Sequence, residues 1–155
     1  MQQVLLIFLM FSMTSTYSQK DDFESNIKNT INTFFEGLHN GDTILLKRVI
    51  SKDLILQTTF VNKEGKSVLR TETKNDFLGA VSRKDSATVW FEKLLSFTIK
   101  IDENLASVWT PYEFYLNDNF SHCGVNYFQL FNNSGNWKII YIIDTRKRQG
   151  CNSSD

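Results

Sequence analysis

Histidine, cysteine and proline are scarce in this chain, and neither sign of charge prevails. The 155 residues include two His, two Cys and one Pro, and 17 Lys and Arg balance 17 Asp and Glu. Metal sites need three or four converging His, Cys or carboxylate ligands, and a chain without net charge has no general attraction for nucleic acid. No glycine-rich loop follows a predicted strand to cradle a nucleotide phosphate. We therefore expect no metal, no cofactor and no nucleic-acid partner.

Long apolar segments are also absent, apart from a short run near the start. Residues 4–11 read VLLIFLMF, and Thr16 and Ser18 stand at the two positions that a signal peptidase inspects, although no Lys or Arg precedes the run. The run is too short to cross a bilayer, and no later stretch approaches about 18 uncharged apolar residues. We expect a signal peptide over residues 1–18, no membrane span, and a secreted or periplasmic protein with one domain over residues 19–155.

Export would place the two cysteines in an oxidising compartment, where disulfides persist. If residues 120–131 and 137–148 pair as a hairpin, Cys123 lies opposite roughly Thr145, and Cys151 lies on the order of 20 Å further along an extended chain. Cysteines whose Cα atoms are more than about 7 Å apart cannot be bridged. A disulfide therefore requires the tail to fold back, and the alternative is a buried thiol at Cys123.

The apolar pattern predicts helices first and strands afterwards. Helical spacing over residues 21–40 is followed by Gly41, which favours a helix end, and Asp42 is suited to cap a second helix up to Ile50. Asn75 or Asp76 is expected to begin a third short helix. Alternation and turn residues predict strands over residues 54–61, 67–73, 89–101, 105–116, 120–131 and 137–148.

The last predicted strand carries apolar residues on both faces. Alternation places Ile140, Ile142, Asp144 and Arg146 on one face, and the other face carries Trp137, Ile139, Tyr141 and Ile143. A sheet that is apolar on both sides needs cover on both sides. We expect the helices to cover one face and a second copy of the chain to cover the other.

The first of these faces changes from apolar to polar along its length. Phe128 and Ile142 lie near the predicted turn, and the far end carries Asn126, His122, Asp144 and Arg146. This gradient is typical of a pocket with an apolar floor and a polar wall. Asp144 is a candidate catalytic base and His122 a candidate acid–base group. The alternative is that Asp144 and Arg146 form a structural ion pair.

A second candidate segment surrounds the single proline. Pro111 cannot donate to a sheet ladder, so it predicts an edge or a bulge, and bulges often redirect side chains near a site. Alternation pairs Tyr112 with Phe114, and Glu113 with Tyr115, so only one pair faces the pocket. Tyr112, Glu113 and Tyr115 are all retained as candidate ligand-binding residues, together with Asn126, Phe128, Ile142 and Arg146.

The segments TPYEFYLNDNFSHCGVNYFQLF and NWKIIYIIDTR resemble the nuclear transport factor 2-like superfamily, in particular its small secreted bacterial members and its SnoaL-like and ketosteroid-isomerase-like branches. The resemblance implies an α+β cone, in which N-terminal helices pack into a strongly curved mixed or antiparallel sheet. It also implies dimers that form through the sheet. Members include isomerases, cyclases, dehydratases and proposed lumazine binders, so the fold does not fix the function.

Three functions follow from this resemblance. The first is a binding protein that holds a small apolar or aromatic molecule in the cone. The second is an isomerase, cyclase or dehydratase that uses Asp144 or His122 in acid–base chemistry. The third is a dimerisation or envelope-assembly module that has no ligand.

Overall fold

The computed structural model describes residues 22–151. The expected signal peptide, residues 1–18, lies outside the described residues. A helix over residues 22–40 agrees with the prediction, and α2 (Thr43–Val49) follows it directly. The Asp42 carboxylate accepts hydrogen bonds from the backbone N–H groups of Ile44 and Leu45 at 2.8 and 2.9 Å, so it caps α2 as expected.

The third helix, α3 (Lys74–Ser82), begins earlier than the sequence suggested. Its N-cap is Thr73, and neither Asn75 nor Asp76 takes that role. The Thr73 hydroxyl accepts from the Asp76 N–H at 3.1 Å and donates to the Asp76 carboxylate at 2.7 Å. Thr73 is extended because it is also the last residue of a strand, which gives the helix its cap without an intervening loop.

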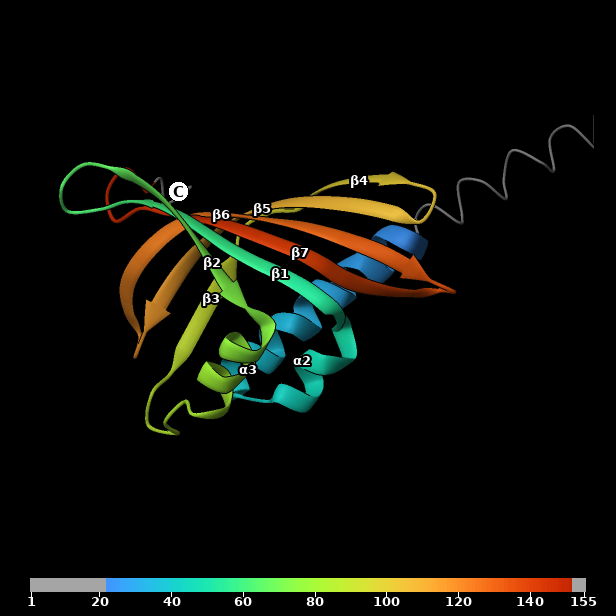
Figure 1. The fold of residues 1–155 in the computed structure, drawn as a ribbon, viewed down its shortest axis with the longest axis horizontal. Coiled ribbons are helices and arrows are strands. Elements are labelled where there is room, and N and C mark those ends of the chain that lie inside the picture. Colours follow the sequence, from blue (N-terminus) through green and yellow to red (C-terminus); the bar gives the residue numbers. More distant parts are fainter. Residues whose placement is uncertain (1–21, 152–155) are drawn as a thin grey trace, which may run out of the picture.

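A single curved sheet of seven strands wraps around the helices (Figure 1). Its spatial order is β2-β1-β7-β6-β5-β3, with β4 also paired to β5, and every pairing is antiparallel except that of β1 with β7. The expected α+β architecture is therefore confirmed. The strand bounds are β1 (Ile50–Val61), β2 (Ser67–Thr73), β3 (Trp90–Leu94), β4 (Thr98–Asp102), β5 (Leu105–Leu116), β6 (Asn119–Asn133) and β7 (Asn136–Arg146).

The strand predicted over residues 89–101 is divided into β3 and β4. Both pair with the same edge of β5, where Leu94 lies opposite Tyr112 and Thr98 opposite Trp109. Pro111 lies between these two ladders, and its carbonyl accepts from the Leu95 N–H at 2.9 Å. Because proline offers no N–H to a neighbouring strand, β5 changes partner at this residue. The irregularity in the β5–β6 register comes later, between Phe114 and Tyr115.

The C-terminal hairpin has a different register from the expected one. The turn consists of Ser134 and Gly135, both with positive φ, which suits the right-handed twist of a two-residue hairpin. Between Gln129 and Leu130 the register then shifts, because Ile140 is an extra residue on β7. The tighter turn and this bulge together move Cys123 from its expected place opposite Thr145 to a pairing with Lys147.

The bulge also corrects the assignment of faces on β7. Alternation alone puts Trp137 and Ile139 on the face opposite Ile142, yet all three residues are buried, with at most 7% of each exposed. Ile140, which alternation placed beside Ile142, is only partly buried. Both halves of β7 therefore turn toward the helices.

The two cysteines form a disulfide, with their Cα atoms 5.9 Å apart. Cys123 and Lys147 exchange two backbone hydrogen bonds of 3.0 Å, and the chain then turns back so that Cys151 reaches Cys123. The alternative of a buried free thiol is thus excluded. The disulfide fixes the five residues that follow β7.

The core lies between the concave face of the sheet and the helices. Ile27, Ile31 and Phe34 of the first helix pack with Phe128 and Ile139, among other buried apolar residues. No helix within residues 22–151 is long and apolar enough to cross a membrane. The convex face keeps large apolar side chains in solvent, among them Ile55, Leu69, Leu105, Trp109 and Phe131.

Candidate functional site

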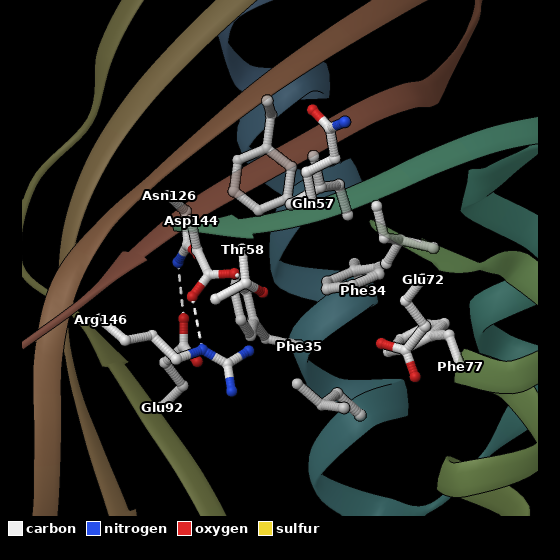
Figure 2. Close-up of a pocket in the computed structure, with 14 residues that line it drawn as sticks. Phe34, Phe35, Gln57, Thr58, Glu72, Phe77, Glu92, Asn126, Asp144 and Arg146 are labelled. Atoms are coloured by element: carbon white, nitrogen blue, oxygen red, sulfur yellow. Dashed lines mark hydrogen bonds and ion pairs between the residues drawn. The ribbon is translucent and has the colours of Figure 1, made fainter. Parts of the chain in front are cut away.

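A cavity of about 100 Å³ lies where the first helix meets the concave face of the sheet (Figure 2). One end is apolar and aromatic, and the other end is polar. The apolar end is formed by Phe34, Phe35, Leu38, Leu56, Phe77, Phe128 and Ile142, and the polar end by Thr58, Glu92, Asn126, Asp144 and Arg146. Two further polar residues line the cavity, namely Gln57 and Glu72, and Glu72 lies beside Phe77. The expected apolar floor and polar wall are therefore present.

Asp144 is the centre of the polar end. The residue is 8% exposed, and its carboxylate accepts from the Thr58 hydroxyl at 2.6 Å and from Arg146 Nε at 2.7 Å. The Tyr112 hydroxyl lies 3.3 Å from the same oxygen as Arg146 and donates to the Thr145 carbonyl at 2.9 Å. The ion pair that the sequence offered as an alternative is formed, and both carboxylate oxygens have donors.

In the PYEFY segment, Tyr112 is on the inward side of β5 and reaches Asp144, although it does not itself line the cavity. Its side chain is buried and contributes the hydroxyl beside Asp144. Burial, followed by the charges of Asp144 and Glu92, raises the pKa of Tyr112 well above its usual range, so the phenol keeps its proton. Glu113 and Tyr115 lie on the opposite face, where the Tyr115 hydroxyl donates to Glu113 at 2.9 Å and Lys93 lies 3.6 Å away.

Glu92 is the functional candidate that sequence reasoning missed. The Asn126 side-chain amide donates to its carboxylate at 2.6 Å. Burial raises the pKa of Glu92 to about 7; the Asn126 hydrogen bond opposes this effect, and the charge of Asp144 adds to it. Glu92 alternates in phase with Trp90 and Leu94, so a carboxylate on the inward side of an aromatic strand is the sequence signal that could have identified it.

His39 holds the backbone of Glu92 in place. Its Nε2 accepts the Glu92 N–H at 2.8 Å. Only an unprotonated nitrogen can accept a hydrogen bond, and burial, followed by the charge of Lys84, lowers the pKa of His39. The C-terminal end of the first helix thus fixes the strand that carries the carboxylate.

His122 does not line this cavity. It faces an open groove of about 1110 Å³, which shares Thr58 and Arg146 with the cavity. The imidazole stacks on Phe114 at a centroid distance of 4.9 Å, and its Nδ1 lies 3.1 Å from the Ser121 hydroxyl. Burial and then the charge of Arg146 lower the pKa of His122 to about 4, so the ring is neutral at pH 7.

Gly124 allows β6 to lie close to the end of β7 at the polar end of the cavity. A Cβ atom on Gly124 would lie 1.8 Å from the Thr145 carbonyl oxygen, so no other residue fits without a shift of the backbone. The same carbonyl accepts the Tyr112 hydroxyl. The close approach of β6 to the end of β7 therefore positions Tyr112 against Asp144. Within residues 22–151, no cluster of three or more His, Cys, Asp or Glu residues is arranged to hold a metal ion.

Comparison with known proteins identifies both a family and a fold. The sequence model of a family described as putative lumazine-binding matches residues 22–142. No curated protein sequence is significantly similar to the chain.

Solved structures share the architecture at low sequence identity. A nuclear transport factor 2-like protein from Cytophaga hutchinsonii is 18% identical, with a TM-score of 0.63 over 80% of this chain and 98% of its own. A protein of unknown function from Mycobacterium tuberculosis is 10% identical, with a TM-score of 0.68 over 86% of this chain and 77% of its own. A putative dehydratase of the same fold from Streptomyces avermitilis is 11% identical, with a TM-score of 0.61 over 83% and 99%.

The pKa of Glu92 predicts a specific dependence of stability on pH. Its folded-state value near 7 lies above the ordinary value of 4.5, so the protonated form contributes stability that is complete below pH 4.5 and lost as the pH rises toward 7. Relative to Glu92→Gln, the wild type should lose about 3 kcal/mol of unfolding free energy between pH 4.5 and pH 8. Urea unfolding at both pH values measures this difference.

Glu64→Gln is the matched control, because Glu64 lies in the exposed turn between β1 and β2. This variant should follow the wild-type pH profile. Parallel profiles for the wild type and Glu92→Gln would show that Glu92 ionises as easily in the folded protein as in the unfolded chain.

Proposed function

The chain belongs to the putative lumazine-binding family of the nuclear transport factor 2-like superfamily, and on that basis we propose that it binds a small, flat, ring-containing molecule at the polar end of its cone. The observation that carries the proposal is that one cavity has aromatic side chains at one end and both hydrogen-bond donors and acceptors at the other. Glu92 and Asp144 offer acceptors, and Arg146 and Asn126 offer donors.

The size of the cavity determines how a ring would bind. Sites for small molecules usually have about 300–1,000 Å³, whereas this cavity has about 100 Å³. A bicyclic ring would therefore place one edge between Phe34 and Asp144 and leave the remainder in the open groove. Thr58 and Arg146 line both spaces, so a single ligand would contact them along its length.

Proton transfer by Glu92 is the second candidate function. A carboxyl group with a pKa of about 7, close to the Asp144–Arg146 ion pair, has the properties of a general acid or base at neutral pH. Asp144 already accepts from Thr58 and Arg146, and the ring of His122 lies outside the cavity. An acid–base reaction in this site would accordingly use Glu92 as the proton carrier and Asp144 to orient Arg146.

A second copy of the chain is the partner that best fits the convex face of the sheet. At the middle of this face the outward side chains are uncharged, and interface cores are depleted of charge. They come from β1, β5, β6 and β7, namely Ile55, Gln57, Thr59, Trp109, Tyr127, Gln129, Tyr141 and Ile143. A self-complementary face of this kind suits a twofold homodimer.

Export is supported by the Cys123–Cys151 disulfide, because such bonds persist in oxidising compartments. Together with the apolar run at residues 4–11, it favours a secreted or periplasmic protein.

Ligand binding is tested with lumazine itself, whose own fluorescence reports its environment. The wild type should quench or shift this emission saturably. Asp144→Asn should weaken binding at least ~10-fold, because it releases Arg146 from its position at the ring edge. Glu64→Gln should bind as the wild type does.

Native mass spectrometry of the protein from its own host complements this titration, since a retained molecule would give its mass directly. No saturable response to lumazine, together with no retained molecule, would favour the module without a ligand. A retained molecule that the purified protein converts, with turnover lost in Glu92→Gln, would favour the acid–base enzyme.

Trp109→Glu tests the dimer. Trp109 is 50% exposed, so the substitution should leave the monomer folded but place a charge in the interface. Sedimentation equilibrium should give twice the chain mass for the wild type and one chain mass for the variant. Ile44→Glu, on α2 and away from the sheet, is the control and should remain dimeric. A monomeric wild type at micromolar concentration would contradict the proposal.

Processing of the N-terminus tests export. Intact mass and N-terminal sequencing of the protein from its own host should give a chain that begins near Gln19, because the predicted cleavage follows Ser18. A host-derived protein that retains residues 1–18 would rule out a cleaved signal.

A further inference from the structure

The open groove beyond the cavity is far larger than the cavity itself, with about 1110 Å³ against about 100 Å³. One wall is the hairpin of β1 and β2, which contributes Phe60, Lys63 and Arg70. The other wall is the end of β7 and the tail that follows it. Figure 1 shows the β1–β2 hairpin and the red segment that follows β7 at the same end of the sheet.

The lining of this groove is strongly basic. Five of its residues are Lys or Arg and none is Asp or Glu, although the chain as a whole is neutral. The cations come from three separate segments, namely Lys63 and Arg70 from the hairpin, Arg146 from β7, and Lys147 and Arg148 from the tail. Their convergence on one hollow concentrates positive potential there, as it does in clefts that collect anions.

Most of these Lys and Arg side chains are not engaged in ion pairs and can therefore contact a ligand. Within the described residues, Arg146 forms an ion pair with Asp144, whereas Lys63, Arg70 and Arg148 have no carboxylate within 4.0 Å. Asp144 accepts from Arg146 Nε, so the two terminal nitrogens of this guanidinium remain available at the junction of cavity and groove. Guanidinium groups bind phosphate and carboxylate with two parallel hydrogen bonds.

The tail that carries two of the cations is held in place. Lys147 exchanges two backbone hydrogen bonds with Cys123, and the disulfide to Cys151 closes the segment. The Lys147 ammonium also donates to the Gly150 carbonyl at 2.9 Å. Residues 147–151 are therefore a constrained wall, which reduces the entropy lost when an anion binds.

We propose that this groove binds an anionic group, a phosphate or a carboxylate, so that the ligand of the cone is an acidic small molecule with its ring edge in the cavity and its charged tail in the groove. This inference rests on the proposed function, since it assigns the second half of the same ligand. Arg70, Arg146 and Arg148 are the residues that would contact the anion, and Lys63 and Lys147 would add to the attraction.

Nuclear magnetic resonance of the two histidines tests the groove directly. His122 lines the groove, and His39 lies elsewhere, on the helix over residues 22–40. Inorganic phosphate and acetate are titrated at pH 7 and constant ionic strength, with chloride as the balancing anion. The His122 resonances should shift saturably with at least one of the two anions, and the His39 resonances should stay in place. The anion that binds more tightly identifies the chemistry of the tail.

Arg70→Ala combined with Arg148→Ala should weaken this binding at least ~10-fold, because two bidentate donors are removed. Arg83→Ala removes an exposed guanidinium at the end of α3 and should change the dissociation constant less than ~2-fold. A response of His122 that is linear in both anions, or that chloride reproduces, would overturn the proposal.

Reduction gives a second, independent measurement. A reducing agent or Cys151→Ser frees the tail, and phosphate affinity should fall by about 3- to 10-fold as Lys147 and Arg148 lose their fixed positions. Unchanged affinity with the disulfide open would show that the tail takes no part in the site.

The lumazine titration separates failure of this inference from failure of the proposed function. Lumazine carries no phosphate or carboxylate tail, so its titration reports ring binding separately from the titrations with inorganic phosphate and acetate. Saturable lumazine binding without anion binding would overturn only the groove proposal. Saturable anion binding without lumazine binding would leave the groove standing and reject a ring ligand of that class.

Discussion

One extra residue in β7, Ile140, sets the geometry on which the rest of the site depends. In a regular strand the face that buries Trp137 and Ile139 would be opposite to the face that carries Ile142 and Asp144. The bulge shifts the phase by one position, so the apolar half of β7 packs on the helices and the polar half faces the same concavity. Bulges also increase the local twist, which bends the sheet around the helices. A cone with an apolar floor and a charged wall is the result.

The charged groups at the polar end of the cavity influence one another. Asp144 is paired with Arg146 and accepts from the Thr58 hydroxyl, and because the group is buried, its charge acts on its neighbours more strongly than a surface charge would. Glu92 shares the cavity with Asp144, and its own burial and this neighbouring charge hold its pKa near 7. The site therefore contains one carboxylate tied to a guanidinium and one carboxyl group that exchanges its proton near neutrality. The two carboxyl groups, one ionised and one able to hold a proton, can distinguish hydrogen-bond donors from acceptors on a ligand, whether or not a reaction follows.

Local patterns in the sequence predicted the helices and most of the strands. The features that they did not predict depend on contacts between residues that are distant in the sequence. Helical spacing and the Asp42 cap are properties of adjacent residues, and both were identified correctly, as was the polar gradient from Phe128 to Asp144. The division of β3 from β4 depends on Pro111, which is distant in sequence and acts through the edge of β5. The register of the hairpin depends on a two-residue turn and a bulge, neither of which follows from alternation alone. Glu92 was missed for the same reason, since its partners Asn126 and His39 are brought to it by the tertiary fold.

The disulfide joins the tail that follows β7 to β6 at the end of the cone. Cys123 lies in register with Glu113, on the face opposite Tyr112 and the cavity, whereas its neighbour His122 faces the groove. The tail pairs with Cys123 at Lys147 and then turns back to form the disulfide, and Lys147 and Arg148 line the groove. A free tail would carry the same charges, but ordering it on a ligand would cost entropy. Because the disulfide orders the tail before a ligand binds, this entropy is not lost on binding. The fixed basic wall therefore depends on the oxidised state of the protein.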